Sequence, residues 1–253
     1  MYEADAVIRR VNSEAILLAG GGRALLMQLA HPLIARGVDE HSNFSADPYP
    51  RLWRTLEATY TIVFGAPAQA RAVAEGLASV HSRVTGLGYQ ANDPALLLWV
   101  HATLIDTSLA IHDLVFGPLA PDEAARYYRE TTRMAELLGV PLACQPPDLP
   151  AFRRYVAETT ASLEVTPTAL RLAEAVLHPP LPRIAAPIAA VQRLVTAGLL
   201  PTSLRRQYGL RWTPAHSATF AALTASARVA YPRLPGSLRH APAWFMVAPT
   251  FRA

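Results

Sequence analysis

Apolar residues recur every three or four positions along most of this chain, and prolines and glycines interrupt them at short intervals. Between Arg51 and Phe64, for example, Leu52, Leu56, Thr59 and Val63 recur at intervals of four, three and four residues. A period of about 3.6 residues is typical of amphipathic helices. No alternation of strand and helix patterns and no internal repeat accompanies it. The sequence therefore predicts an all-α fold.

The positions of the interruptions predict a series of helices joined by short turns. The predicted helices cover residues 14–19, 23–29 with a continuation toward 36 that Pro32 should kink or end, 51–64, 68–84, 94–116, 122–138, 150–163, 168–177, 183–197, 202–208 and 214–231. Residues 43–50 read as a polar loop, and residues 232–253 read as an irregular C-terminal arm wrapped on the domain. A length of 253 residues favours one compact helical domain over residues 1–253.

Composition excludes several classes of protein. Apolar residues make up 51% and charged residues 17%, which rules out a disordered chain. The net charge of +4 is a modest excess, so nucleic acid is not an expected partner. Every basic residue is Arg, which excludes chemistry that needs a lysine. A lone cysteine, Cys144, excludes a disulfide framework, a Cys-rich zinc site and a covalent Cys-x-x-Cys-His haem attachment.

The N-terminus and the longest apolar segment bear on localisation. Met1 to Asp5 is acidic where a signal peptide needs positive charge, so we expect a cytoplasmic protein. Residues 94–116 are apolar enough to suggest a membrane span, but they contain His101, Asp106, His112 and Asp113. So many ionisable groups favour a buried core helix. We expect no transmembrane span, and peripheral contact with a membrane stays open.

Three familiar kinds of site are incomplete here. Gly20-Gly21-Gly22 resembles a dinucleotide-binding turn, but Leu25 replaces the third glycine and no parallel-sheet pattern follows. No Gly-x-Ser-x-Gly hydrolase motif is present. The eight histidines lack the His-Glu-x-x-His and paired Glu-x-x-His spacings of metal enzymes. Isolated histidines are usually at the surface or hydrogen-bonded, and we interpret five of them in this way: His31, His41, His178, His216 and His240.

Polar side chains on otherwise apolar helices are stronger candidates. His81 has Leu77 one turn before it and Val84 one turn after it, with Val80 adjacent. A neutral imidazole pointing into the interior there needs a hydrogen-bond partner or a metal, because burying an unsatisfied polar group costs about 1–3 kcal/mol. His101 and His112 lie near one face of residues 94–116, where a core or supporting role is the simplest interpretation.

Arg51, Arg54 and Thr55 share one face of the predicted helix 51–64. One interpretation is that both arginines are solvated residues of the first turn. The other is that they anchor the carboxylates of a bound ligand, for which a forked guanidinium is well suited.

Beyond these candidates, the order of several motifs resembles the latex-clearing-protein (rubber oxygenase) and MpaB-like oxygenase family. The resemblance covers most of the chain. It rests on Leu29-Ala30-His31-Pro32, Gly37-Val38-Asp39-Glu40-His41-Ser42, Asp47-Pro48-Tyr49-Pro50-Arg51-Leu52-Trp53-Arg54-Thr55, Val80-His81-Ser82-Arg83-Val84-Thr85-Gly86, Asn92-Asp93-Pro94, Trp99-Val100-His101, Tyr127-Tyr128, Leu138-Gly139-Val140-Pro141, Leu200-Pro201, Tyr208-Gly209-Leu210 and Trp212.

The resemblance implies an all-helical domain that holds a non-covalent haem b. It implies His81 as the proximal iron ligand, Arg51 as a holder of a haem propionate, and Thr55 as a residue that orients bound dioxygen or water. Rubber oxygenases can carry Lys where this chain has Arg54, and a guanidinium cannot ligate iron. Rubber oxygenases are also exported and longer, so polyisoprene is not the substrate we expect. Glu40 and His41 are further candidates, as a base near the pocket.

Three functional hypotheses follow. The first is a haem b-dependent oxygenase that uses dioxygen on a small apolar substrate, with Arg51 and Thr55 as catalytic residues and His81, Arg51, Arg54 and Thr55 as cofactor-binding residues. The second is a haem- or ligand-binding helical protein without turnover. The third is a structural helical protein in which His81 and His101 are satisfied core histidines.

Overall fold

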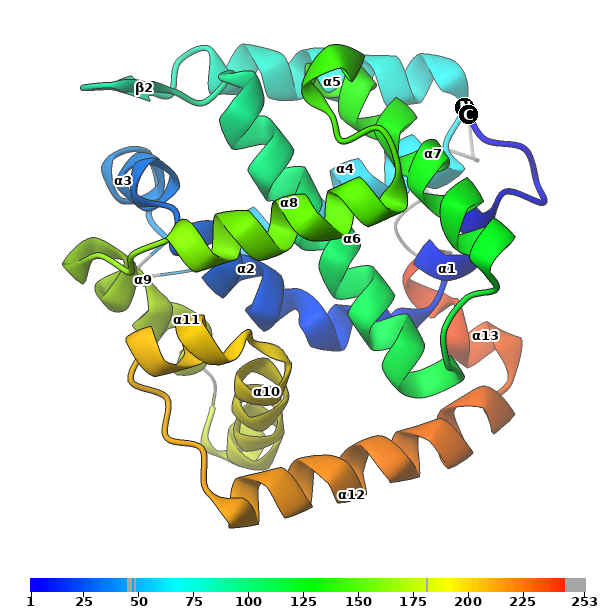
Figure 1. Ribbon diagram of the computed structural model, residues 1–253, viewed down its shortest axis with the longest axis vertical. Coiled ribbons are helices and arrows are strands. Elements are labelled where there is room, and N and C mark those ends of the chain that lie inside the picture. The colour runs from blue at the N-terminus through cyan, green and yellow to red at the C-terminus, as the bar shows by residue number, and fades with distance from the viewer. Residues whose placement is uncertain (45–46, 48, 181, 244–253) are drawn as a thin grey trace.

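The computed structural model describes residues 1–44, 47, 49–180 and 182–243, and this part of the chain is almost entirely helical (Figure 1). The prediction of an all-α fold is confirmed. The elements of the first half are α1 (Val7–Asn12), η1 (Ala15–Gly20), α2 (Gly21–Leu29), α3 (Pro32–His41), α4 (Tyr49–Phe64), α5 (Pro67–His81), β1 (Thr85–Gly86), β2 (Tyr89–Gln90) and α6 (Pro94–Phe116).

The second half is punctuated by proline, as the sequence predicts. Its elements are α7 (Pro121–Leu137), η2 (Leu142–Cys144), α8 (Leu149–Ser162), α9 (Pro167–Leu177), η3 (Arg183–Ala185), α10 (Ala186–Leu199), α11 (Thr202–Gln207), α12 (Pro214–Ala230), η4 (Tyr231–Arg233) and α13 (Gly236–Arg239). Proline occupies the first turn of most of the longer helices, where its missing N–H costs nothing.

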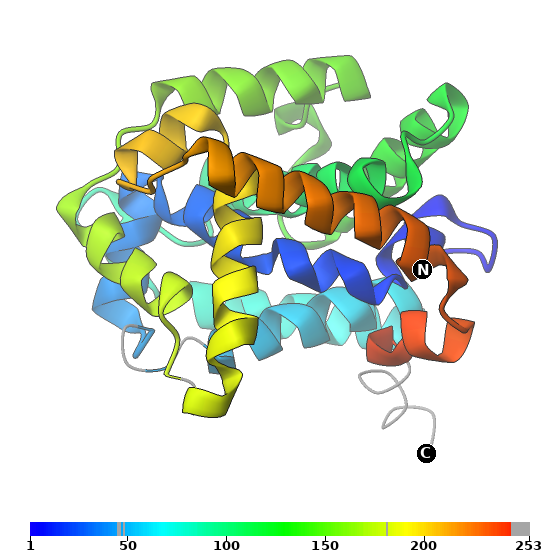
Figure 2. The ribbon, with the colours of Figure 1, turned by 90° about the horizontal axis from the view of Figure 1, so that it is seen from below.

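Helix α6 runs through the middle of the molecule and packs against α2, α8 and α12 (Figures 1 and 2). The Asp93 carboxylate caps its first turn by accepting from the Ala95 N–H at 2.8 Å. Gly117 ends it with a φ of 88°, a conformation that favours glycine. By length and composition α6 could cross a membrane, but 56% of its most apolar stretch is buried inside the protein. A core helix satisfies the same composition test.

The triple glycine serves helix packing. A Cβ on Gly20 would collide with Thr107 of α6, and a Cβ on Gly22 would collide with Thr196 of α10. The missing side chains therefore let α2 approach both neighbours closely. Next to them Arg23 is buried, and its guanidinium donates to Asp106 Oδ2 at 2.6 Å and to the Leu199 carbonyl at 2.9 Å. This arrangement agrees with rejecting a dinucleotide turn.

Several element boundaries differ from prediction. Pro32 was expected to kink or end the helix that begins near Arg23, and the second alternative is found: α2 ends at Leu29 and Pro32 begins α3. Helix α5 ends at His81 rather than Val84, and residues 85–90 form an antiparallel hairpin that the sequence did not predict. Helix α1 was also missed. The C-terminal arm contains η4 and α13 within the described residues, and residues 244–253 lie outside them.

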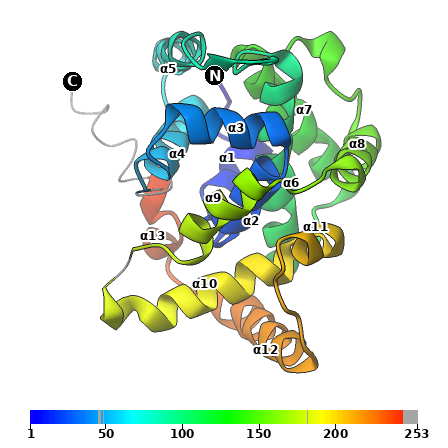
Figure 3. The same ribbon diagram turned by 90° about the vertical axis from the view of Figure 1, so that its left-hand side faces the viewer.

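Two groups of helices occupy opposite ends of the molecule. Helix α5 and the hairpin lie at one end, and α10, α11 and α12 lie at the other (Figures 1 and 3). Between the two ends, the buried core includes Trp99, Tyr127, Phe152, Leu172 and Leu204, each at most 1% exposed.

Candidate functional site

Helices α4 and α5 form an antiparallel pair that brings the predicted site residues together. The two helices pack along their length and are joined by a turn at Gly65 and Ala66. A Cβ at Gly65 would collide with the Thr61 carbonyl, so the tight turn requires glycine. Because the chain reverses there, the first turn of α4 lies beside the last turn of α5. We call this place the open end of the α4–α5 pair.

His81 is the last residue of α5 and is half-buried at this open end. Burial lowers the pKa of its imidazole, and the nearby positive charge of Arg51 lowers the pKa further. Both causes favour the neutral ring, which carries a free nitrogen lone pair. Within the described part of the chain, no hydrogen bond or ion pair engages the His81 side chain. The expected apolar surroundings are only partly present, because Val80 is 50% exposed.

Arg51 and Arg54 lie in the first turns of α4. Arg51 is half-buried, and burial and the neighbouring charge of Arg54 both lower the pKa of its guanidinium. Arg54 is exposed. No carboxylate among the described residues forms an ion pair with either arginine. A half-buried cation without a counterion is costly, and a bound anionic group would relieve that cost.

Thr55 is half-buried one turn beyond Arg51. Its hydroxyl donates to the Arg51 carbonyl at 2.9 Å. That bond commits the hydroxyl proton to the backbone of α4, so the oxygen can only accept from another group. Thr55 therefore fixes the first turn of the helix that carries Arg51.

Two more of the predicted candidates, Glu40 and His41, hold the hairpin against α3. The Tyr89 hydroxyl donates to Glu40 Oε2 at 2.6 Å, and burial together with this carboxylate raises the pKa of Tyr89 to about 12. The His41 Nε2–H donates to the Thr85 carbonyl at 3.0 Å. Since the hairpin follows His81 directly, these contacts restrain the segment next to the site. Both groups already have structural partners, which weakens the interpretation of either as a base.

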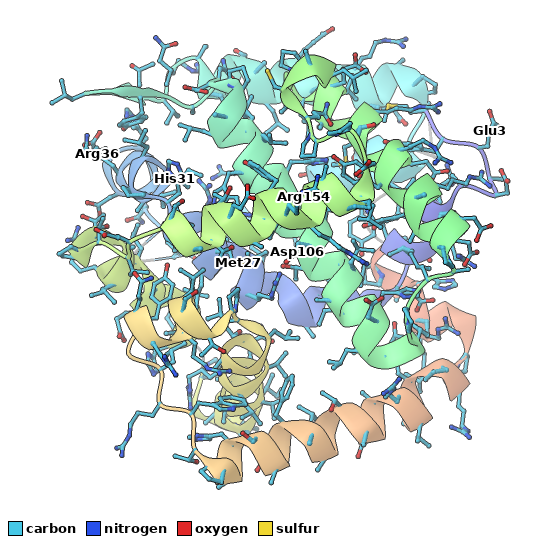
Figure 4. All side chains as sticks on the ribbon, viewed as in Figure 1. Glu3, Met27, His31, Arg36, Asp106 and Arg154 are labelled. Carbon is cyan, nitrogen blue, oxygen red and sulfur yellow. The ribbon has the colours of Figure 1, made fainter. Side chains whose placement is uncertain are left out.

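His31 is the histidine that sequence reasoning misjudged (Figure 4). Its Nδ1 is buried without a hydrogen-bond partner, and burial lowers the pKa of the ring. The other four isolated histidines behave as predicted. His41 is exposed and hydrogen-bonded, His178 contacts Glu174, His216 contacts Thr213 and His240 contacts Glu14. The sequence signal at His31 is weak, because its burial comes from the packing of neighbouring helices.

His101 and His112 are hydrogen-bonded to the backbone, in agreement with core or supporting roles. His101 is fully buried in α6, its Nε2 lies 2.9 Å from the Thr131 carbonyl, and burial lowers its pKa to about 4. The neutral ring therefore donates its Nε2–H to that carbonyl. His112 Nδ1 lies 3.1 Å from the Gly117 carbonyl at the end of the same helix.

The side chains at the open end include kinds of group that could hold a haem. Among the described residues, no three His, Cys, Asp or Glu side chains form a group that could hold a metal ion. A haem brings four nitrogen ligands of its own, so it needs only one neutral imidazole from the protein and cations for its carboxylates. His81, Arg51 and Arg54 supply these groups.

Among the described residues, cavities occur away from the open end of the α4–α5 pair. One of about 360 Å³ lies between α5, α6 and α7, and another of about 410 Å³ lies between α9, α10 and α12. Neither is lined by His81 or Arg51. The candidate site is therefore identified by side chains that could bind a ligand, and not by a cavity.

The fold and the site define a helical domain with a single-histidine candidate cofactor site. The family model described as "ER-bound oxygenase mpaB/B'/Rubber oxygenase, catalytic domain" matches residues 8–229. The chain therefore belongs to this oxygenase family, in agreement with the resemblance seen in the sequence.

Relatives from two mycobacteria are also similar. Uncharacterized proteins of Mycobacterium tuberculosis (Rv2237) and Mycobacterium bovis (Mb2261) are each 29% identical to this chain over 225 residues. The match covers 83% of this chain and 87% of each relative. No solved structure matches the chain.

Proposed function

We propose that this oxygenase-family domain binds haem b at the open end of the α4–α5 pair and uses dioxygen on a small apolar substrate. The observation that carries the proposal is that the His81 imidazole, whose pKa is lowered, lies near the Arg51 guanidinium, and that no side chain of the described residues pairs with either group. Membership of the oxygenase family supports the reaction class.

His81 would be the protein ligand to the iron. Its lowered pKa keeps the ring neutral near pH 7, and only a neutral ring has a lone pair to donate. Because the described residues leave its side chain unengaged, binding would break no existing hydrogen bond. When bound, the haem would supply the iron chemistry that activates dioxygen, and His81 would hold it in the protein.

Arg51 and Arg54 would hold the two propionates. Carboxylates there would supply the counterions that the described chain does not provide, and charge-assisted bonds to guanidinium groups are among the stronger hydrogen bonds. Arg54 cannot ligate iron, so a second protein ligand from this position is excluded. Thr55 would hold the Arg51 backbone in place and offer its oxygen as an acceptor to a protonated group in the pocket.

The test is haem reconstitution followed by absorption spectroscopy. Wild-type protein should show a Soret band, and His81→Gly should lose it or shift it markedly. Added imidazole should restore the band in His81→Gly, because a free ring can occupy the space of the missing side chain. Arg51→Gln should retain the band and bind haem roughly tenfold more weakly, since it loses a charge-assisted contact.

His178→Gly is the matched control, because His178 is an exposed histidine on a different helix end. It should leave the spectrum unchanged, and circular dichroism should confirm that every variant is folded. A wild-type protein without a Soret band, or a His81→Gly protein with an unaltered one, would contradict the proposal. Oxygen consumption with a chemical reductant separates an oxygenase from a haem carrier: the proposal requires turnover above free haem.

A further inference from the structure

Acidic residues are absent from the last third of the chain. Residues 175–253 contain nine Arg and neither Asp nor Glu, whereas an even spread of the 19 acids would place about six there. The first 174 residues hold all 19 acids and 14 Arg, so the two parts carry formal charges of −5 and +9. We call residues 175–253 the acid-free segment. Such a charge asymmetry is typical of chains that contact an anionic surface.

The structure gathers much of this segment at one end of the molecule. Helices α10, α11 and α12 lie together, away from α5 and the hairpin (Figures 1 and 3). Arg206, Arg211 and Arg228 are exposed there. Within the described ranges, none of the three forms an ion pair or a side-chain hydrogen bond. Their positive charge is therefore available to a partner.

An exposed apolar stripe lies on α10 and the turn before it. Ile184, Ile188 and Val191 are 90%, 70% and 47% exposed. Their spacing of four and three residues places them on one face of the helix. The opposite side of α10 packs inward through Ala189, Thr196 and Ala197. We call the three exposed residues the α10 stripe.

The cavity between α9, α10 and α12 adds positive charge to the same end. Every titratable residue in its lining is basic: His178, Arg193, Arg211 and His216. Its remaining lining includes Leu194 and Trp212. A pocket with apolar walls and only basic titratable groups suits the phosphate of a lipid headgroup.

We propose that the α10–α12 end docks on the surface of an anionic lipid bilayer. The α10 stripe would enter the boundary between headgroups and acyl chains, while the unpaired arginines contact lipid phosphates. An amphipathic helix with an apolar face and basic neighbours binds membranes in this way. The interaction is peripheral and goes beyond the proposed haem chemistry.

A lipid surface explains both features, whereas nucleic acid explains only one. Phosphate backbones attract arginines, but they offer nothing to a row of exposed isoleucines. A purely apolar protein partner would leave the arginines unpaired. The combination of charge and apolar surface therefore favours a membrane.

The test measures co-sedimentation of the full-length protein with vesicles. Wild-type protein should bind vesicles of phosphatidylcholine with about one third phosphatidylglycerol, and binding to phosphatidylcholine alone should be much weaker. Binding should fall as salt rises, because exposed charges are screened. Arg211→Gln and Arg228→Gln should each reduce partitioning roughly fivefold. The double variant Ile184→Ser/Ile188→Ser should reduce it roughly tenfold or more.

Arg153→Gln/Arg154→Gln is the matched control, because it removes two exposed arginines from α8, outside the acid-free segment. This control should retain most of the binding. Equal loss in the control and in Arg211→Gln/Arg228→Gln would overturn the proposal, because net charge alone would then explain binding. Absence of vesicle binding by the wild type would also overturn the proposal. The stripe would then be a candidate for self-association, and the arginines would be candidates for binding a nucleic acid duplex. Haem spectra are recorded separately, so failure here leaves the proposed function untouched.

Discussion

The pKa values of His101 and His81 are both lowered, which favours the neutral imidazole, but the two rings have different roles in the structure. The His101 ring is enclosed in the core and donates to the Thr131 carbonyl, so it serves the fold. The His81 ring is half-buried, is unengaged by the described residues and lies beside an unpaired cation. Residue spacing placed both histidines on apolar helices, and only the family resemblance assigned them different roles, because the surroundings of each ring depend on how the helices pack.

The core histidine predicts a pH-dependent stability. Burial lowers the pKa of His101 from 6.5 to about 4, so the unfolded chain takes up this proton more readily than the folded one. Its contribution to stability is complete above about pH 6.5 and is lost as pH falls towards 4, by about 3 kcal/mol. His101→Gln retains an N–H donor but cannot titrate, so urea midpoints should fall less steeply with acidification.

The exposed His178 provides the comparison for this measurement. His178→Gln removes an exposed histidine and should retain the steep acid dependence that the wild type owes to His101. A His101→Gln profile as steep as that of the wild type would show that His101 does not control acid stability.

At the scale of helices, the sequence predicted those elements whose own residues mark where they begin and end. Helices α6 and α12 were predicted because a long apolar run marks the first and proline marks the start of both. The β1–β2 hairpin was missed, because four paired residues depend on contacts with α3, such as that between Tyr89 and Glu40. The proximity of Arg51 and His81 also needed the packing of two helices. Sequence order also could not show that no carboxylate among the described residues pairs with Arg51.

The close approach of α2 to α10 predicts a specific coupling. Gly22→Ala should destabilise the protein by about 1–3 kcal/mol, because the new methyl group would collide with Thr196. Thr196→Ala in the same chain should relieve the collision, giving a coupling of at least about 1 kcal/mol in a double-mutant cycle. Urea denaturation measures both values.

Gly76 provides a control at the middle of α5. A Cβ there meets nothing within 4 Å, so Gly76→Ala should stabilise the protein by about 0.5–1 kcal/mol through helix propensity. Additive effects of Gly22→Ala and Thr196→Ala would contradict the packing argument.

At the scale of the molecule, long-range bonds connect the α10–α12 end to the core. The Tyr208 hydroxyl donates to the Leu26 carbonyl at 2.7 Å, and Arg23 donates to the Leu199 carbonyl. Helix α12 also packs on α6. The sequence indicated a single domain from length alone, and it could not show which helices share these contacts.

These connections predict one cooperative unfolding unit. Amides of α6, α10 and α12 should become exchangeable with the same dependence on urea, as measured by hydrogen exchange with mass spectrometry. We expect this because unfolding of α10 would remove a helix that packs closely against α2. Opening of α10 and α12 at clearly lower urea than α6 would show a separate subdomain.

The acid-free segment also makes the distribution of formal charge along the chain uneven. Formal charges of +9 and −5 are divided between two parts of one chain. Helices α10 to α12, which carry part of the positive charge, lie at one end (Figure 1). A molecule of this kind rotates in a local field before it touches the source of that field. Its orientation on approach to any charged boundary is therefore set by the distribution of arginines along the chain, ahead of any contact.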